Sequence, residues 1–349
     1  MDNTEHISAK INGQETIKNE VSTVSIIIPC YNEEGFIERC LDSVLANDYP
    51  GKKYEALVVD GMSTDRTRII VQGYIDRYNN VRLIDNPDRY TPVAFNIGIR
   101  NAQNEIIMIM GSHSTYAKDY ISQCVYYLNK YEADNVGGTM KTVSRNASLM
   151  GELIANTISH PFGVGNSTFR TGSKELKWVD TVFGGCYRRE VFNRIGFFNE
   201  KLLSSQDIDF NIRLRKSGGK ILFVPTIVTD YYTRSDLISF IRNNFRNGVW
   251  AILPFKYTKQ LLKLRHLVPM FFVSGIITIV TLSIVFPVFW YLTLLFALLY
   301  GATAVYHAIG IAVRVKDIRY VFLIPFMFFG LHLVYGLGSI KALFMILKR

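Results

Sequence analysis

VSIIIPCYNEE, from Val24 to Glu34, decides the fold of this chain together with ALVVDGMSTDRT, from Ala56 to Thr67. Each stretch is a short run rich in β-branched residues that stops at Pro29 or Asp60 and then turns polar, as the start of a helix does. The pattern predicts parallel strands with helical crossovers in an α/β fold. The carboxyl ends of such strands form the ligand crevice of an open sheet. The polar residues expected at that crevice are Tyr31, Asn32, Glu33, Asp60, Ser63 and Asp65.

The residue types at these strand ends indicate a nucleotide rather than a bare phosphate. The sequence has neither a GxGxxG nor a GxxxxGK[ST] motif, which excludes the dinucleotide fingerprint and the P-loop. Carboxylates, an amide and a hydroxyl suit the edges of a base and a ribose. The alternative is that Asp60 and Asp65 only cap the following helix, because Asp is a favoured N-cap residue.

The PCYNEE and VVDGMSTDRT segments resemble the opening of the family 2 glycosyltransferases. That family shares the nucleotide-sugar-binding GT-A fold, with a mixed, mostly parallel sheet. The resemblance continues through TPVAFNIGIRNA, from Thr91 to Ala102, and covers most of residues 22–250. Two further runs, HPFGVGNSTFR from His160 and FGGCYRRE from Phe183, resemble the succinoglycan-type glucosyltransferases of exopolysaccharide synthesis. The resemblance implies that the nucleotide sugar is bound by Pro29, Tyr31, Asn32, Glu33, Asp60, Ser63, Asp65, Ala94 and Asn96.

The resemblance also points to a metal site just after the strand EIIMIM, at Glu105–Met110. Family members hold a divalent ion there with Asp-x-Asp, whereas this chain reads Gly111, Ser112, His113. Because imidazole nitrogen can bind Mn²⁺, His113 is expected to be the ligand for Mn²⁺ or Mg²⁺. The alternative is a metal-independent enzyme, in which guanidinium groups neutralise the departing diphosphate. The candidates are Arg89, Arg170 and Arg246.

The catalytic base is expected in SSQDIDFNIRLRKSGG, from Ser204 to Gly219. The resemblance favours Asp207, because the family's Glu-Asp pair aligns with Gln206 and Asp207, and Asp209 is the second choice. A single base without a carboxylate nucleophile implies one in-line displacement with inversion at the anomeric carbon. Alternatively, both aspartates cap a helix whose arginines are solvated. The Gly-rich segment from Phe162 to Gly165 is a candidate wall on the acceptor side, or a plain turn.

Composition predicts a membrane part after the globular domain. The chain has 349 residues, of which 49% are hydrophobic, and single domains seldom exceed roughly 250 residues. Leu267–Val313 and Tyr320–Ile340 contain no Asp, Glu, Lys or Arg. We expect hydrophobic segments at 267–289, 291–313 and 320–346, since about 20 apolar residues cross a bilayer. The first two should form a hairpin, and Pro325 leaves the third open as a span or a re-entrant segment.

The resulting domain order is a polar leader (1–22), a GT-A domain (23–233), amphipathic interfacial helices (234–266) and the membrane domain (267–349). The positive-inside rule places both ends of the hairpin, and with them the catalytic domain, in the cytoplasm. The cations that lead to this are Lys256, Lys259, Lys263, Arg265, Arg314, Lys316 and Arg319. Residues 1–23 have no apolar core and so no signal peptide is expected. We expect a multi-pass protein of the cell inner membrane.

The net charge of +10 does not indicate nucleic acid, because the basic residues gather beside the membrane segments and no nucleic-acid motif accompanies them. Anionic lipid is the expected counterpart. The four cysteines show no metal-binding spacing and fit a reducing cytosol.

The sequence therefore predicts an inverting glycosyltransferase that moves a hexose, glucose from UDP-glucose, to a polyprenyl-diphosphate-linked sugar at the cytoplasmic membrane face. Two alternatives stay open: an enzyme that charges polyprenyl phosphate directly, and a catalytically inactive membrane scaffold. The linkage and the oligomeric state are not indicated by the sequence.

Overall fold

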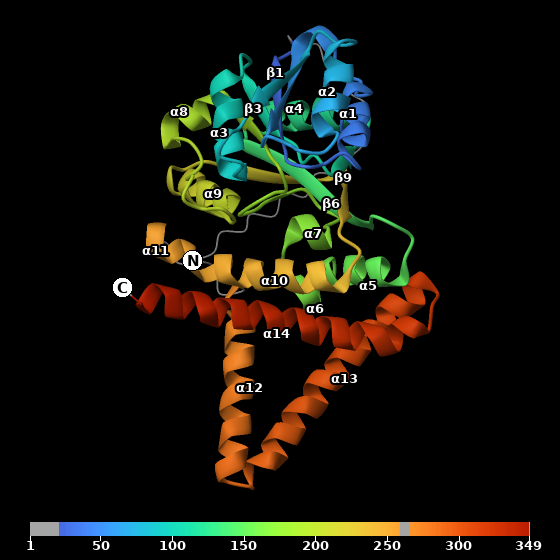
Figure 1. The fold of residues 1–349 in the computed structure, drawn as a ribbon, viewed down its shortest axis with the longest axis vertical. Helices are drawn as coiled ribbons and strands as arrows, with labels where there is room; N and C mark the ends of the chain where they lie inside the picture. The colour runs from blue at the N-terminus through green and yellow to red at the C-terminus, as the bar shows by residue number, and fades with distance from the viewer. Residues whose placement is uncertain (1–20, 259–265, 349) are drawn as a thin grey trace. The chain divides into compact units, whose positions relative to one another are not determined.

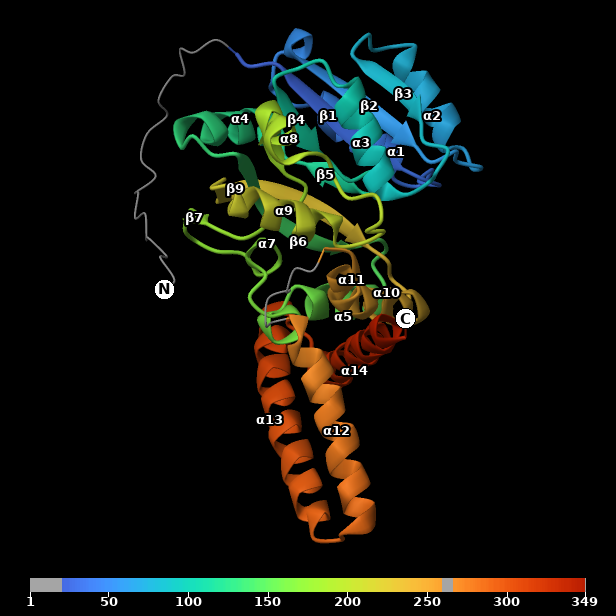
Figure 2. The same cartoon turned by 90° about the vertical axis from the view of Figure 1, so that its left-hand side faces the viewer.

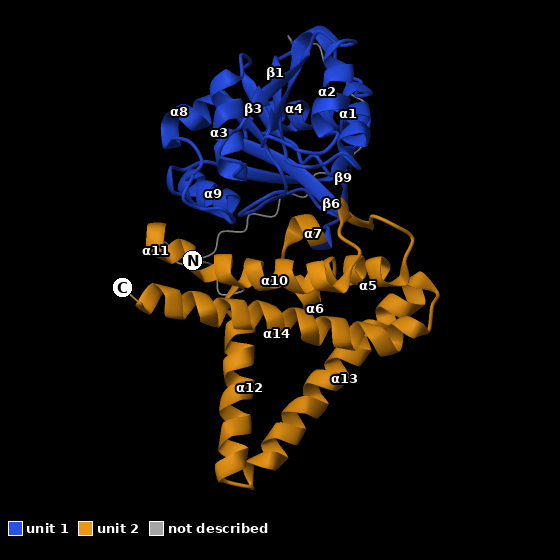
Figure 3. Cartoon of the chain, in the orientation of Figure 1, with its two compact units in different colours: residues 1–141, 171–231 blue, residues 142–170, 232–349 orange. Residues whose placement is uncertain are grey.

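The computed structural model describes residues 21–258 and 266–348. The chain forms two compact units, one of residues up to 141 with 171–231, the other of residues 142–170 with 232–349 (Figure 3). Residues 142–170, which the sequence placed in the GT-A domain, thus belong to the second unit. The leader up to residue 20, and Lys259, Lys263 and Arg265 of the expected cationic flank, lie outside the described residues.

The first unit is built on a nine-stranded sheet in the order β3-β2-β1-β4-β8-β6-β9-β5, with β7 beside β9. Parallel pairing joins β3 (Val81–Asp85), β2 (Tyr54–Asp60), β1 (Val24–Cys30) and β4 (Ile106–Ile109). The antiparallel part contains β5 (Ser114–Tyr116), β6 (Asn135–Ser144), β7 (Lys177–Trp178), β8 (Cys186–Arg188) and β9 (Ile221–Thr233). The predicted mixed α/β sheet is confirmed.

Helices pack on both faces of β1, β2 and β4, which explains why most residues of these three strands are buried. Ile26 and Ile28 face a core shared with α1 (Ile37–Leu45), α2 (Thr67–Ile75) and α4 (Tyr120–Lys130). Ile27 faces α3 (Thr91–Asn101), where a Cβ added at Gly98 would lie 2.4 Å from its Cγ2. The remaining helical elements of this unit are η1 (Gly51–Lys53), α8 (Arg189–Ile195) and α9 (Gln206–Lys216).

Strand register brings the polar strand ends together. Cys30 pairs with Asp60 and Asp60 pairs with Asp85, so β1, β2 and β3 end level with one another. The polar residues that follow these strands therefore lie at one edge of the sheet, as the sequence predicted.

The second unit is helical. Its helices are α5 (Leu149–Ile158), α6 (Pro161–Val164), α10 (Leu237–Ile252), α11 (Pro254–Thr258), α12 (Val268–Val285), α13 (Phe289–Val315) and α14 (Arg319–Leu347), and α7 (Thr168–Thr171) lies at the chain boundary between the units. Within the described residues, α12, α13 and α14 are long and apolar enough to cross a membrane. The expected hairpin is present, since α12 and α13 lie side by side and join through a short turn (Figure 2).

Helix α14 lies across the open end of this hairpin and beside α10 (Figure 1). Two glycines bring the backbones of α10 and α14 together, because a Cβ at Gly248 would lie 2.0 Å from Tyr335 O and one at Gly338 2.2 Å from Phe245 O. Ser339 Oγ also donates to Gly248 O at 3.0 Å. The buried face of α10 is therefore set by the small residues that admit α14.

This packing covers only part of the apolar surface of α10. Ile238 is 70% exposed, and Leu237 and Ile241 are exposed as well. Phe240 and Gly248 are buried instead. Helix α14 packs against the small residues of α10, where the two backbones can approach closely. The exposed apolar side chains of α10 remain beside Arg242.

Candidate active site

A cavity of about 440 Å³ opens at the carboxyl ends of β1 and β4 in the first unit. This volume is within the range of small-ligand sites. Five segments supply most of its walls: the turn after β1, the start of α3, the turn after β4, the loop before β8 and the start of α9. Among the lining residues are Pro29, Tyr31, Glu33, Asn86, Arg89, Tyr90, Ala94, His113, Phe183, Phe198, Gln206, Asp207 and Tyr231.

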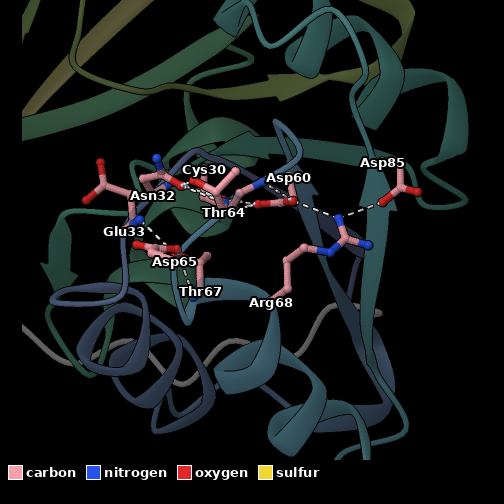
Figure 4. A network of polar contacts seen from close by, with 10 residues as sticks. Cys30, Asn32, Glu33, Asp60, Thr64, Asp65, Thr67, Arg68 and Asp85 are labelled. Atoms are coloured by element: carbon pink, nitrogen blue, oxygen red, sulfur yellow. Dashed lines mark hydrogen bonds and ion pairs between the residues drawn. The ribbon is translucent and has the colours of Figure 1, made fainter.

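The turns after β1 and β2 are joined by a hydrogen-bond network (Figure 4). Asn32 N donates to Ser63 Oγ at 2.9 Å, and Glu33 N donates to Thr67 Oγ1 at 2.8 Å. In return, Thr64 N donates to Asn32 Oδ1 at 2.8 Å. Asn32 adopts φ 53°, a left-handed conformation that Asn tolerates better than most residues. This network fixes the turn that presents Tyr31 and Glu33 to the cavity.

Asp60 lies beneath that turn and is fully buried. Its carboxylate accepts from Ser63 N at 2.9 Å and from Arg68 Nη1 at 2.7 Å, while Arg68 also reaches Asp85 at 2.8 Å (Figure 4). Burial alone would raise the pKa of Asp60, but the hydrogen bonds from Ser63 and the charge of Arg68 lower it overall. Burial and the nearby carboxylate raise the pKa of the Cys30 thiol, which donates to Asp60.

The structure divides the nine residues expected to bind the nucleotide sugar into two groups. Pro29, Tyr31, Glu33 and Ala94 line the cavity. The other five are not among its lining residues: Asn32, Asp60, Ser63, Asp65 and Asn96. Four of these belong to the turn network or the carboxylate beneath it, since Asp65 Oδ2 accepts from Glu34 N at 3.1 Å. Their direct contact with a nucleotide stays a prediction.

Asn96 holds a second part of the wall in place. Its Nδ2 donates to Phe198 O at 2.9 Å and to Glu200 Oε1 at 2.7 Å, and its Oδ1 accepts from Phe198 N at 3.0 Å. Phe198 lines the cavity. The geometry therefore gives Asn96 a positioning role between α3 and the loop before α9.

His113 follows β4, which pairs with β1 on the side away from β2. It therefore lies on the opposite side of the β1 turn from the Asn32–Ser63 network. Its Nδ1 is 3.4 Å from Glu33 Oε1, and its ring packs edge-on against Tyr231 with centroids 5.0 Å apart. In the part of the chain that the structure describes, no group of three or more His, Cys, Asp or Glu side chains could hold a metal. His113 and Glu33 are a two-residue donor set, which fits a divalent ion only if substrate oxygens complete its coordination.

The two candidate bases have different surroundings. Asp207, in the first turn of α9, lines the cavity. Asp209 is buried and pairs with Arg213, whose Nε lies 3.0 Å from its Oδ2. Arg213 also donates to Ile195 O at 2.6 Å, so it is not the solvated cation of the capping alternative. The geometry favours Asp207 as the carboxylate that can meet a substrate.

Three residues of the cavity wall carry buried polar atoms without a hydrogen-bond partner among the described residues: Asn86 Oδ1, His113 Nδ1 and Gln206 Oε1. Buried polar groups are nearly always paired in folded proteins, so Asn86 Oδ1 and Gln206 Oε1 are candidate acceptors for a ligand, whereas His113 Nδ1 already faces Glu33 Oε1 at 3.4 Å. Sequence reasoning missed Asn86. It follows the end of β3 directly, and the strand-end rule applied to β1 and β2 would have found it.

Backbone strain is also concentrated here. Arg89 and Ser205, both lining the cavity, adopt φ 63° and 62°. Such conformations cluster at ligand sites because the surrounding structure must enforce them. The Arg89 guanidinium lies 5.8 Å from the centroid of the Tyr31 ring. Arg170 and Arg246 belong to the second unit, and their part in diphosphate binding stays a prediction.

Residues 25–196, which include the network, the His113 turn and most of the cavity wall, match the family model Glycosyl transferase family 2. These residues form a family 2 glycosyltransferase domain. The protein is a glycosyltransferase, as the sequence predicted.

Relatives of this glycosyltransferase extend beyond the domain. It is 28% identical over 328 residues to the dolichyl N-acetyl-alpha-D-glucosaminyl phosphate 3-beta-D-2,3-diacetamido-2,3-dideoxy-beta-D-glucuronosyltransferase of Methanococcus voltae, which covers 92% of this chain and 97% of that protein. It is 27% identical over 247 residues to the succinoglycan biosynthesis protein ExoA of Rhizobium meliloti, covering 70% of this chain and 74% of ExoA.

A solved structure supports the fold. The mannosyltransferase PcManGT from Pyrobaculum calidifontis, in complex with GDP-Man and Mn²⁺, has a TM-score of 0.58 to this glycosyltransferase at 20% identity. The match covers 94% of this chain and 88% of that one. At this identity the likeness shows the GT-A fold alone.

Proposed function

We propose that this glycosyltransferase transfers a hexose from a nucleotide sugar to a sugar that is carried on a polyprenyl-linked lipid at the cytoplasmic membrane face. The observation that carries this proposal is the cavity in which Asp207 shares a wall with the β1 turn, Arg89 and His113. The finer prediction names glucose from UDP-glucose as donor and a polyprenyl diphosphate as lipid carrier in exopolysaccharide synthesis. The name of ExoA supports that setting.

The lipid acceptor is supported by two independent observations. The Methanococcus relative, matched over almost its whole length, is named for action on a dolichyl phosphate sugar. In the described part of the same chain that carries the donor cavity, three helices are apolar enough to cross a membrane. A soluble acceptor would not require these helices, whereas a polyprenyl-linked acceptor is confined to the bilayer. The proposed location is therefore the cell inner membrane, with the catalytic domain in the cytoplasm.

In the proposed reaction, the residues of the β1 turn hold the nucleotide sugar and Asp207 acts on the acceptor. The Asp207 carboxylate takes the proton of the acceptor hydroxyl as its oxygen bonds to the anomeric carbon. The bond from that carbon to the diphosphate breaks, and the nucleoside diphosphate leaves with the electron pair. Because attack and departure occur on opposite sides, the anomeric configuration inverts.

The departing diphosphate needs positive charge, and this is commonly the largest catalytic contribution. Arg89 is a resident cation of the cavity wall. His113 and Glu33 would hold Mn²⁺ or Mg²⁺ together with oxygens of the diphosphate. A bound divalent ion would neutralise the charge that develops on the leaving group.

The experiment is transfer by the purified full-length protein in nanodiscs. UDP-glucose, UDP-GlcNAc and GDP-mannose are offered with a polyprenyl-linked sugar or with polyprenyl phosphate alone. We expect product from the lipid-linked sugar. Product from polyprenyl phosphate alone would identify the direct-charging alternative, and no product from any pair would favour the scaffold.

The Asp207→Asn variant tests the base. Transfer should fall by roughly 10²- to 10⁴-fold while donor binding is retained. Asp209→Asn is the matched control, since Asp209 lies in the same helix turn but its carboxylate pairs with Arg213. This variant should have a lower melting temperature, while its transfer rate should fall far less than that of Asp207→Asn. Near-normal transfer by Asp207→Asn would contradict the assignment.

A further inference from the structure

The HPFG segment at His160–Gly163 lies in the second unit, where the reaction proposed above gives it no role. His160 caps α6, and its Nδ1 accepts from Phe162 N at 3.1 Å. Because Nδ1 is an acceptor, the neutral ring carries its proton on Nε2. That nitrogen makes no hydrogen bond within the described part of the chain, so it can donate to a ligand.

Phe162 holds this segment against the membrane-capable helices. Its ring centroid is 4.9 Å from that of His307 on α13 and 5.0 Å from that of Phe328 on α14. His332 Nε2 lies 2.9 Å from Phe162 O. The position of the His160 ring relative to α13 is thus set by packing.

Three groups that can carry positive charge meet at this point. The rings of His160 and His307 have centroids 4.9 Å apart. Arg314 lies two turns beyond His307 on the same face of α13, and its Nη2 donates to Asn156 Oδ1 at 2.7 Å. Burial, followed by the charges of His307 and Arg314, lowers the pKa of His160 to about 4. The charged form of His160 is therefore disfavoured.

No carboxylate balances this group among the described residues. Arg314 makes no ion pair there, and neither ring nitrogen of His307 has a hydrogen-bond partner. The nearby Glu152 accepts instead from the hydroxyl of Tyr320 at 2.7 Å. His160, His307 and Asn156 are half-buried and Arg314 is exposed, so a ligand can reach all of them. Ionisable residues on membrane helices are costly, and they commonly mark a substrate path.

We propose that His160, His307 and Arg314 form a binding site for the phosphate of a polyprenyl-linked lipid. A guanidinium matches phosphate oxygens in charge and geometry, and the N–H group of a neutral imidazole donates a hydrogen bond to them. The neighbouring surface of α13 suits an isoprenoid chain, because Tyr306, Ile309 and Val313 are exposed there. This inference rests on the proposed function, since it names the site that receives the lipid-linked acceptor.

The test is direct binding of polyprenyl monophosphate to the full-length protein in nanodiscs of neutral lipid, followed by native mass spectrometry. His307→Phe keeps a ring of similar shape against Phe162, and Arg314→Gln removes the guanidinium. We expect each variant to bind at least about 10-fold more weakly, with partial rescue by Arg314→Lys. Lys316→Asn removes an exposed cation near Arg314 at φ 61°, which Asn tolerates, and should bind within twofold of the wild type.

Two competition arms identify the ligand. Inorganic phosphate should compete only weakly, and phosphatidylglycerol should not displace the polyprenyl lipid at equal concentration. Equal competition by phosphatidylglycerol would overturn the proposal in favour of a general anionic-lipid surface. Binding within twofold of the wild type by both His307→Phe and Arg314→Gln would overturn it outright.

Transfer assays on the same preparations separate this site from the proposed function. Loss of polyprenyl phosphate binding in the variants, with no transfer by the wild type, would support the site and contradict the function. Transfer by the wild type, with an unchanged acceptor KM in the variants, would support the function and overturn the site.

Discussion

Replacing Asp60 by Asn tests whether this carboxylate stabilises the fold or contacts the bound nucleotide. Asp60 is fully buried and accepts from Ser63 and from Arg68. Removing one partner of a buried ion pair costs about 3–5 kcal/mol. The cost should be at the lower end, about 3 kcal/mol, because Arg68 is partly exposed and keeps Asp85 as a partner. At about 2–4 °C per kcal/mol for a domain of this size, the melting temperature should fall by about 6–12 °C.

The pH dependence of this effect has a defined sign. The pKa of Asp60 is lowered by folding from its ordinary 3.8. A group with a lowered pKa stabilises the fold above its unfolded-state pKa, and this stabilisation is lost as pH falls through the folded-state pKa. The difference in melting temperature between wild type and Asp60→Asn should be constant from about pH 6 to 8 and shrink below about pH 4.

The assay is thermal unfolding of the full-length protein across this pH range, with nucleotide-sugar binding measured on the same samples. Asp48→Asn is the control, because Asp48 is exposed and its carboxylate makes no hydrogen bond or ion pair among the described residues. It should melt within about 2 °C of the wild type. The reasoning is refuted if Asp60→Asn melts as the wild type does but no longer binds donor, since Asp60 would then contact the nucleoside itself.

Three further changes test other parts of the molecule. Treatment with a chelator should abolish transfer, and added Mn²⁺ or Mg²⁺ should restore it. The His113→Ala variant should need a higher metal concentration for half-maximal transfer. Full activity in excess chelator would show that transfer does not depend on a divalent metal. Gly248→Leu places a side chain where a Cβ would already be 2.0 Å from Tyr335 O. It should lower the free energy of unfolding by about 1–3 kcal/mol, as measured by thermal unfolding. Gly275→Leu, with open space around its Cβ, should be nearly neutral. A cysteine at Leu347 should react with a membrane-impermeant reagent only from the side that carries the catalytic unit; labelling from the opposite side would show that α14 spans the bilayer.

The parallel half of the sheet was predictable because its determinants are local. The predicted apolar runs begin at Val24 and Ala56 and stop at Pro29 and Asp60, and they lie within the observed strands Val24–Cys30 and Tyr54–Asp60. The membrane-capable helices were likewise predictable from uncharged length. The assignment of residues 142–170 to the helical unit was not, because it depends on contacts of Leu153 and Phe162 with helices far along the chain.

The sequence predicted which strand ends form the site, but it did not predict which of their residues line the cavity and which hold the turns in place. Asp60 ends β2 and Glu33 follows β1, and only the side-chain network shows that Asp60 lies beneath the turn while Glu33 lines the cavity. Similarly, Asp207 and Asp209 are equivalent by composition. The partner Arg213, one turn further along α9, engages Asp209 and leaves Asp207 at the cavity wall.

The packing of α14 bears on whether the third hydrophobic segment spans the bilayer, which its hydropathy leaves open. A third span would run alongside both helices of the hairpin over their length. Instead, Gly336 of α14 meets Pro269 and Val273 at the first turns of α12, and Phe328 packs with Ala304 and Ala308 in the second half of α13. Those contacts lie at the same end of an antiparallel hairpin, the end away from its turn. Within the described residues, α14 therefore packs across that end of the hairpin and beside α10 rather than along the length of the hairpin.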